Sequence, residues 1–232
     1  MNQYHDPALY RSRWRSRIRR LLQRGVFRSI VGSVVTQTIS VHPSVHKVRG
    51  AFVLVANHSS HLDAPMLMQG LPIKQARYLS TGVAREYFFE VWYRRIFVRW
   101  MFNAFPIDRD GSKKNSGLSR RLLKAGVPIL VFPEATRSTT GRMAEFKPGA
   151  AALATGVGVP VIPAALIGGH EAMPKGRNWP KPGKPPVGVV FGEPMRPFEG
   201  EVVTEFSARV QATVAELYES NYRTVMGEEL SE

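Results

Sequence analysis

The 232-residue chain contains no cysteine, so disulfide bonds, thiolate nucleophiles and cysteine metal sites are excluded. Acidic residues are also few: 18 Asp and Glu face 32 Lys and Arg, and the formal net charge is +14. This imbalance predicts an anionic partner, which can be a nucleic acid, a membrane surface or a phosphorylated substrate. The hydrophobic content of 44% is too high for a disordered chain and suits one globular domain.

The chain also lacks an apolar run typical of a transmembrane helix. The longest uncharged stretch, 149–170, carries Pro160 and Pro163 near its middle, and these prolines would break a spanning helix. A buried helix followed by a buried strand fits this stretch better. No apolar segment follows the basic residues at the N-terminus, so it does not resemble a signal peptide. We therefore expect a soluble or peripheral protein.

Half of the net charge lies in residues 1–28, which hold eight arginines and one acid, Asp6. Apolar residues recur there at helical spacing and face away from most of the arginines: Tyr10, Trp14, Ile18, Leu21 and Leu22. Such a helix suits the surface of an anionic membrane. The alternative is a solvated basic helix whose apolar stripe packs on the domain. We assign residues 1–45 to this basic amphipathic segment and residues 46–232 to a globular domain.

The globular domain has the hydrophobic pattern of an α/β fold. Four short runs of continuous hydrophobicity predict strands that are covered on both faces, at 51–56, 127–132, 159–166 and 187–192. Five helices are predicted around them, at about 64–70, 85–103, 115–125, 147–157 and 202–222. Residues 34–41 favour neither state. The predicted fold class is α/β, with a mixed, largely parallel central sheet covered by helices.

The first predicted strand runs into the sequence NHSSHLDAP at residues 57–65. Asp63 can accept a hydrogen bond from Nδ1 of His58, which leaves Nε2 free to deprotonate a hydroxyl group. Asp63 can instead cap the next helix, because it precedes Ala64 and Pro65. Zinc ligation by His58, His61 and Asp63 is a third reading, but the H-x-x-H-x-D spacing differs from that of zincins. We expect no metal.

Further charged residues follow other strand ends or turns, where ligands collect in open α/β sheets. Glu134 and Arg137, in the sequence FPEATRS, can form an anion-binding turn or a local ion pair. Arg109 lies in a predicted turn. Lys147 precedes a helix of small residues, whose N-terminal N–H groups favour an anion.

Four motifs, in this order, together resemble the glycerolipid acyltransferases, which include the 1-acylglycerol-3-phosphate (lysophosphatidic acid) acyltransferases. They are N-H-x-S-x-x-D from Asn57, P-I-D-R from Pro106, F-P-E-x-T-R-S from Phe132 and V-P-V-I-P from Val159. The resemblance implies an O-acyltransferase of phospholipid biosynthesis. It would move a fatty acyl group from acyl-CoA or acyl-carrier protein to the hydroxyl of a lysophospholipid such as 1-acylglycerol-3-phosphate. The thioester is a co-substrate, so no cofactor is expected.

The resemblance also implies residue roles. His58 would be the general base and Asp63 the carboxylate that orients it, without a covalent acyl-enzyme. The acceptor phosphate would be held by Arg137, with Arg109 and Lys147 as further contacts. The turn of the acceptor site would be formed by Glu134, Ala135 and Thr136.

Two departures from the family pattern stand out. Ala135 replaces a glycine, and a positive φ at this position would cost about 1–2 kcal/mol. The segment Ala84-Arg85-Glu86 carries Arg where the family often has Lys. Because Arg presents two donors to a phosphate and Lys a point charge, the head-group preference can differ from that for simple lysophosphatidate.

Residues 85–105 hold nine of the 23 aromatic residues, interleaved with arginines. We expect most of them in the core. The alternative is that some line an acyl-chain channel or lie at the lipid interface.

The expected partners are a membrane surface with anionic lipid, a lysophospholipid acceptor and an acyl thioester donor. The expected location is peripheral, at the cytoplasmic face of the cell membrane. Nucleic acid is not expected, because no recognised binding motif is present. Two other functions stay open: an acyltransferase for a different glycerolipid or glycolipid acceptor, and a non-catalytic basic membrane-binding module.

Overall fold

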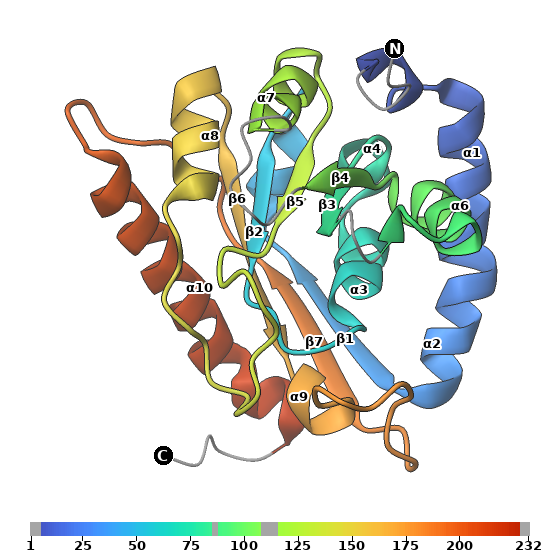
Figure 1. Ribbon diagram of the computed structural model, residues 1–232. Coiled ribbons are helices and arrows are strands. Elements are labelled where there is room, and N and C mark those ends of the chain that lie inside the picture. Colours follow the sequence, from blue (N-terminus) through green and yellow to red (C-terminus); the bar gives the residue numbers. More distant parts are fainter. Residues whose placement is uncertain (1–5, 85–87, 108–115, 228–232) are drawn as a thin grey trace.

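A computed structural model of the chain describes residues 6–84, 88–107 and 116–227. Within these ranges the centre is a seven-stranded sheet of order β1-β7-β6-β2-β5-β3-β4, with helices on both faces (Figure 1). All neighbouring strands are parallel except the antiparallel pair β6 and β7. The strands are β1 (Thr36–Val41), β2 (Val53–Ala56), β3 (Ser80–Ala84), β4 (Phe105–Ile107), β5 (Ile129–Val131), β6 (Val161–Ile167) and β7 (Pro186–Phe191). The predicted α/β class is confirmed.

Two layers of helices bury the two faces of the sheet. The helices are α1 (Arg13–Leu21), α2 (Arg28–Val34), α3 (Asp63–Gly70), α4 (Ile73–Ala76), α6 (Trp92–Phe102), α7 (Ser116–Lys124), α8 (Gly149–Val157), α9 (Gly169–Ala172) and α10 (Val203–Met226). Side chains of α7, α8 and α10 form one core with the sheet, and those of α2 and α3 form the other. A π-helical stretch, η3 (Leu22–Phe27), joins α1 to α2.

The four strands with continuous hydrophobicity are present, and the stretch 149–170 forms α8 and then β6 as predicted. Strands β1, β3 and β4 were not predicted. β1 has a polar sequence, TQTISV, and pairs along its length with β7 from Thr36 opposite Pro186 to Val41 opposite Phe191. The sheet therefore begins at Thr36, ahead of the boundary that the sequence suggested at residue 46.

Helix α1 buries polar side chains and exposes apolar ones, the reverse of the usual pattern for a helix of a globular domain. Its buried residues are polar, Ser16 and Arg19, while Trp14 and Leu21 are 54% and 69% exposed. The alternative in which the apolar stripe packs on the domain is therefore wrong for Trp14, Ile18 and Leu21, all of which are exposed.

The aromatic segment also differs from expectation. Helix α6 begins at Trp92, and residues 85–87 lie outside the described residues. Of the described aromatic residues in 88–105, only Phe89 and Phe105 are buried, whereas Trp92, Tyr93 and Phe97 are exposed. The expectation that most of them lie in the core is wrong, because apolar spacing identifies a face without saying what covers it. In the described part of the chain, no helix is both long and apolar enough to cross a membrane.

Candidate active site

The sheet order brings two of the predicted motifs to one edge. β2 and β5 are adjacent and parallel, so the segments that follow Ala56 and Val131 leave the sheet side by side. The backbone N–H of Ser138 donates to the carbonyl of His58 at 2.8 Å, which joins the two loops directly. This is the carboxyl edge of parallel strands, where α/β folds place their ligands.

His58 and Asp63 form a hydrogen bond at this edge, with Nδ1 and Oδ2 2.8 Å apart. The same Oδ2 accepts the backbone N–H groups of Ser59 and Ser60 at 2.7 and 2.8 Å. Asp63 is fully buried, whereas the His58 side chain is 22% exposed. Because Asp63 accepts at Nδ1, the imidazole presents Nε2 as the basic nitrogen. The helix-cap reading is wrong, since Leu62 is the N-cap of α3 and makes no side-chain cap bond.

Three further residues hold this pair: Asn57 and Phe132, which begin two of the sequence motifs without a role assigned to them, and Gly169, which the sequence did not single out. The ring of Phe132 stacks on the imidazole of His58 with ring centroids 4.0 Å apart. The amide of Asn57 exchanges two hydrogen bonds with the backbone of Leu166 and fixes the loop to β6. A Cβ on Gly169 would lie 3.1 Å from Oδ1 of Asp63, so this glycine permits a close approach of backbone to carboxylate.

Glu134 braces the loop of His58. Its Oε1 accepts the backbone N–H of His58 at 2.6 Å, and its Oε2 accepts that of Ala144 at 2.8 Å. Both oxygens are thus occupied by the backbone rather than by the guanidinium of Arg137. Burial raises the pKa of the Glu134 carboxyl, which the two N–H groups partly oppose. The carboxylate acts as a brace between three segments of chain.

Ala135, which stands where the family pattern has glycine, adopts a left-handed conformation with φ of 65°. The turn therefore keeps its shape and carries strain of about 1–2 kcal/mol. Thr136 is exposed, and its hydroxyl accepts a hydrogen bond from Nζ of Lys175 at 3.4 Å. Lys175, which follows α9, is a cation at this turn that the sequence did not single out.

The predicted phosphate contacts have different positions. Arg137 is half-buried, and its Nη1 is buried with no hydrogen-bond partner among residues 6–84, 88–107 and 116–227. Burial lowers the pKa of His61, and the positive charge of Arg137 is the second cause of this shift. Lys147 is exposed, and its backbone N–H donates to Pro133 at 3.1 Å. Arg109 and the pair Arg85-Glu86 lie outside the described residues. No group of three or more His, Asp or Glu side chains in the described ranges could hold a metal ion.

The fold and the site together define an α/β domain with a carboxylate-bound histidine and a half-buried arginine in the loops that follow two adjacent parallel strands. A family model described as Acyltransferase matches residues 36–167, which is more than half of the chain. The chain belongs to this acyltransferase family.

Curated relatives carry a more specific name. A 1-acyl-sn-glycerol-3-phosphate acyltransferase of Pseudomonas aeruginosa is 42% identical over 101 residues, 40% of this chain and 36% of that protein. A 1-acyl-sn-glycerol-3-phosphate acyltransferase alpha of Mus musculus is 32% identical over 162 residues, 62% of this chain and 53% of that protein. The chain thus spans between a third and about half of these relatives' length.

A solved structure shares the fold over most of the chain. It is the 1-acyl-sn-glycerophosphate (LPA) acyltransferase PlsC of Thermotoga maritima, with a TM-score of 0.69 and 25% sequence identity. The superposition covers 87% of this chain and 78% of that one.

Proposed function

We propose that this protein transfers a fatty acyl group from an acyl thioester to the hydroxyl of a lysophospholipid such as 1-acylglycerol-3-phosphate, in glycerolipid synthesis. The observation that carries the proposal is the His58–Asp63 hydrogen bond at the carboxyl edge of the sheet. The names of the Pseudomonas and mouse relatives support the acceptor class. Either acyl-CoA or acyl-carrier protein serves as the thioester in this proposal.

In the proposed reaction, Nε2 of His58 removes the proton of the acceptor hydroxyl as its oxygen attacks the thioester carbonyl. The carbon–sulfur bond breaks, an ester forms, and the imidazolium returns the proton to the leaving thiolate. Asp63 holds the ring and stabilises the transient positive charge. Because Oδ2 of Asp63 also binds two backbone N–H groups, the carboxylate stays fixed while the charge on the ring changes.

In this proposal, Arg137 binds the phosphate of the acceptor. The buried Nη1 of Arg137, which has no hydrogen-bond partner in the part of the chain that the structure describes, supports the assignment, since a buried unpaired guanidinium nitrogen is costly until an anion binds it. Arg109 and Lys147 remain proposed further contacts, and Lys175 joins them because it reaches Thr136. Glu134, Ala135 and Thr136 shape the turn that presents Arg137.

We also propose that the protein docks peripherally on the cytoplasmic face of a membrane that contains anionic lipid. The supporting feature is a set of exposed apolar side chains on α1, η3, α2 and α6, here named the apolar surface: Trp14, Ile18, Leu21, Val26, Ile30, Trp92, Tyr93, Ile96 and Phe97. α1 and α6 lie side by side (Figure 1), and the rings of Trp14 and Trp100 meet edge to face at 5.4 Å. Arginines beside such side chains suit a membrane interface.

The test of the reaction is the variant His58→Ala, assayed for acyl transfer from a long-chain acyl thioester to lysophosphatidic acid. Loss of a general base predicts a fall in kcat of about 10²–10⁴-fold. His61→Ala in the same loop is the matched control, because it removes an imidazole without removing the Asp63 contact. Equal transfer by His58→Ala and wild type would contradict the proposal. Crossing several lysolipids with both donor types identifies the preferred acceptor and donor.

The test of docking is Leu21→Asp in a vesicle sedimentation assay. It should lose binding, since a charge replaces a large exposed apolar side chain of α1. Val202→Asp, at an exposed apolar position before α10 that lies outside the apolar surface, is the control and should bind as wild type does. If both variants bind alike, the apolar surface does not dock.

A further inference from the structure

A hollow lies between α1 and α6, at the other end of the strands from His58. Its wall includes Asn103 and Ala104, which come directly before β4. β4, β3, β5 and β2 are consecutive parallel neighbours, so the start of β4 and the segment after β2 lie at opposite edges of the sheet. The hollow is thus separate from the proposed acyl-transfer site.

The hollow contains a buried arginine that has no acidic partner among the described residues that line it. Arg19 is only 4% exposed, and its Nη2 has no hydrogen-bond partner in the described part of the chain. None of the nine residues that line the hollow is acidic. Burial, and then the neighbouring charge of Arg15, lowers the pKa of Arg19 to about 10, so the side chain stays charged at neutral pH. A buried charge of this kind is stabilised when an anion pairs with it.

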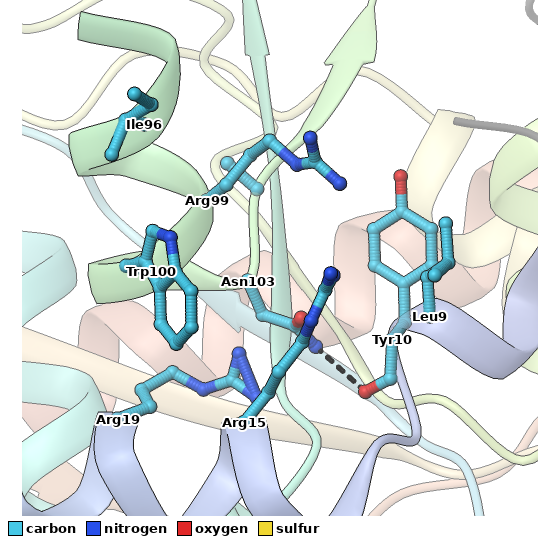
Figure 2. Close-up of a pocket in the computed structure, with 9 residues that line it drawn as sticks. Leu9, Tyr10, Arg15, Arg19, Ile96, Arg99, Trp100 and Asn103 are labelled. Carbon is cyan, nitrogen blue, oxygen red and sulfur yellow. Dashed lines mark hydrogen bonds between the residues drawn. The ribbon is translucent and has the colours of Figure 1, made fainter. Parts of the chain in front are cut away.

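Two more arginines converge on the same space. Figure 2 shows Arg15 and Arg19 rising from α1 while Arg99 extends from α6 across the hollow, with Trp100 on one side. The guanidinium carbon of Arg15 lies 5.6 and 5.9 Å from the ring centroids of Trp14 and Trp100. Contact with these rings holds the guanidinium of Arg15 at the wall of the hollow.

The wall opposite α1 is fixed before any ligand binds. Asn103 ends α6 in a left-handed conformation, with φ of 51°. Its amide donates to the carbonyls of Tyr10 and Tyr78, both at 3.1 Å, and to the hydroxyl of Ser80 at 2.7 Å. These bonds join the N-terminal segment to the start of β3. A preorganised wall lowers the ordering cost of binding.

The hollow adjoins the apolar surface. Trp14 and Ile96 are 54% and 48% exposed, Ile96 also lines the hollow, and Trp14 contacts the lining residue Trp100. A ligand there would place its anionic group among guanidiniums and its apolar part beside these side chains. A phospholipid has that arrangement, with a phosphate next to acyl chains. Arg15 and Arg19, with no acidic residue among the nine that line the hollow, would disfavour the ammonium of a zwitterionic head group.

We propose that this hollow binds the phosphate of an anionic phospholipid, whose acyl chains remain in the bilayer against Trp14 and Ile96. The inference rests on the proposed membrane docking and adds a lipid-selective site to it. It does not depend on the acyl-transfer reaction, because the lipid is bound at the opposite edge of the sheet.

The experiment compares two double variants that each remove two charges from the same helical stretch. Arg15→Gln with Arg19→Gln alters the hollow. Arg13→Gln with Arg28→Gln alters arginines that are exposed and do not line it. Each protein is titrated, at physiological salt, with phosphatidylcholine vesicles that contain or lack phosphatidylglycerol. The wild type should bind the phosphatidylglycerol vesicles more tightly.

The variants of the hollow should lose about 10-fold more affinity for these vesicles than the control pair, since direct charge-assisted hydrogen bonds add to the attraction that all basic residues share. Equal losses in the two pairs would overturn the site and leave docking intact. Failure of the wild type to bind either vesicle would overturn docking itself and the site with it.

A titration with a soluble anion distinguishes a lipid site from a site for free phosphate. Inorganic phosphate should not change the tryptophan fluorescence at concentrations where phosphatidylglycerol vesicles do, because it lacks the contact with Trp14 and Ile96. An equal response to phosphate, lost in the variants of the hollow, would overturn the lipid assignment in favour of a free-phosphate site. Should Arg19→Gln fail to fold, Arg15→Gln alone, at a half-buried position, gives the same comparison against Arg13→Gln.

Discussion

Gly169→Ala tests whether the backbone of α9 positions Asp63, the carboxylate of the proposed catalytic pair. The new Cβ would lie 2.7 Å from Oγ of Ser59 and 3.1 Å from Oδ1 of Asp63, whereas an ordinary van der Waals contact of a Cβ atom is 3.4–4 Å. Asp63 cannot yield freely, because its other oxygen holds His58, Ser59 and Ser60. The loop must therefore shift by a fraction of an ångström.

Misplacement of a catalytic group by about 1 Å costs on the order of 10²-fold, so a smaller shift predicts a fall in kcat of about 10-fold or more. Overpacking also predicts a loss of about 1–3 kcal/mol in the free energy of unfolding. Steady-state kinetics and urea unfolding measure the two effects. The KM for the thioester should stay constant, since Gly169 positions the base rather than the donor.

Two companion variants make this prediction refutable. Gly117→Ala adds a methyl group in α7 where nothing lies within 4 Å, and should stabilise the protein by about 0.5–1 kcal/mol. Ser59→Ala removes the atom with the closest contact and should restore part of the activity when combined with Gly169→Ala. Wild-type kcat and stability in Gly169→Ala, or no recovery in the double variant, would refute the reasoning.

Three further predictions concern the loop after β5. Glu134→Gln replaces one acceptor oxygen by an NH₂ group that faces a backbone N–H, so urea unfolding should show a loss of about 1–3 kcal/mol. Because the folded-state pKa of Glu134 lies above the ordinary value of 4.5, the folded protein binds this proton more tightly. The free energy of unfolding of the wild type, relative to that of Glu134→Gln, should therefore rise as the pH falls from neutral through the raised pKa. A difference between the two proteins that does not change with pH would contradict this. Ala135→Gly should relieve the strain at φ 65°. The free energy of unfolding should rise by about 0.5–1 kcal/mol, which allows for the greater entropy that glycine gives the unfolded chain. A destabilised variant would show that the turn is not strained. Arg137→Ala should raise KM about 10-fold or more for a phosphorylated acceptor and much less for a monoacylglycerol, since a charge-assisted hydrogen bond to phosphate is lost; equal changes for both acceptors would remove Arg137 from phosphate binding.

The predictable part of the fold is the part with continuous hydrophobicity. β2 and β6 lie between layers of helices, and all their residues are buried, so their sequences alone identify them as strands. β1 is an edge strand whose polar residues face solvent, and its pairing with β7 depends on a partner about 150 residues away. β4 has three residues, too few for a periodic signal.

The predictable part of the site is likewise local. His58 and Asp63 lie in one loop, five residues apart, so their spacing alone suggested the hydrogen bond. The brace from Glu134 to His58 spans 76 residues, and the approach of Gly169 to Asp63 depends on β6 lying next to β2. Contacts of this kind follow from the order of strands, which the chain's pattern does not specify. The aromatic residues of α6 show the same limit, since their spacing was clear and their environment was not.

The π-helical stretch η3 keeps the apolar side chains of two helices in phase. Five residues separate Leu21 from Val26, and in an α-helix they would rotate Val26 about 140° past a full turn, away from Leu21. A π-helix closes its hydrogen bonds over five residues, so its wider turn returns Val26 to the side of Leu21. Val26 and Ile30 are then exposed in line with Trp14 and Ile18. A deletion of one residue within Leu22–Gly25 would leave the valine four residues after Leu21, about 40° past a full turn of an α-helix, so a regular α-helix would then keep the line without the π-helical turn.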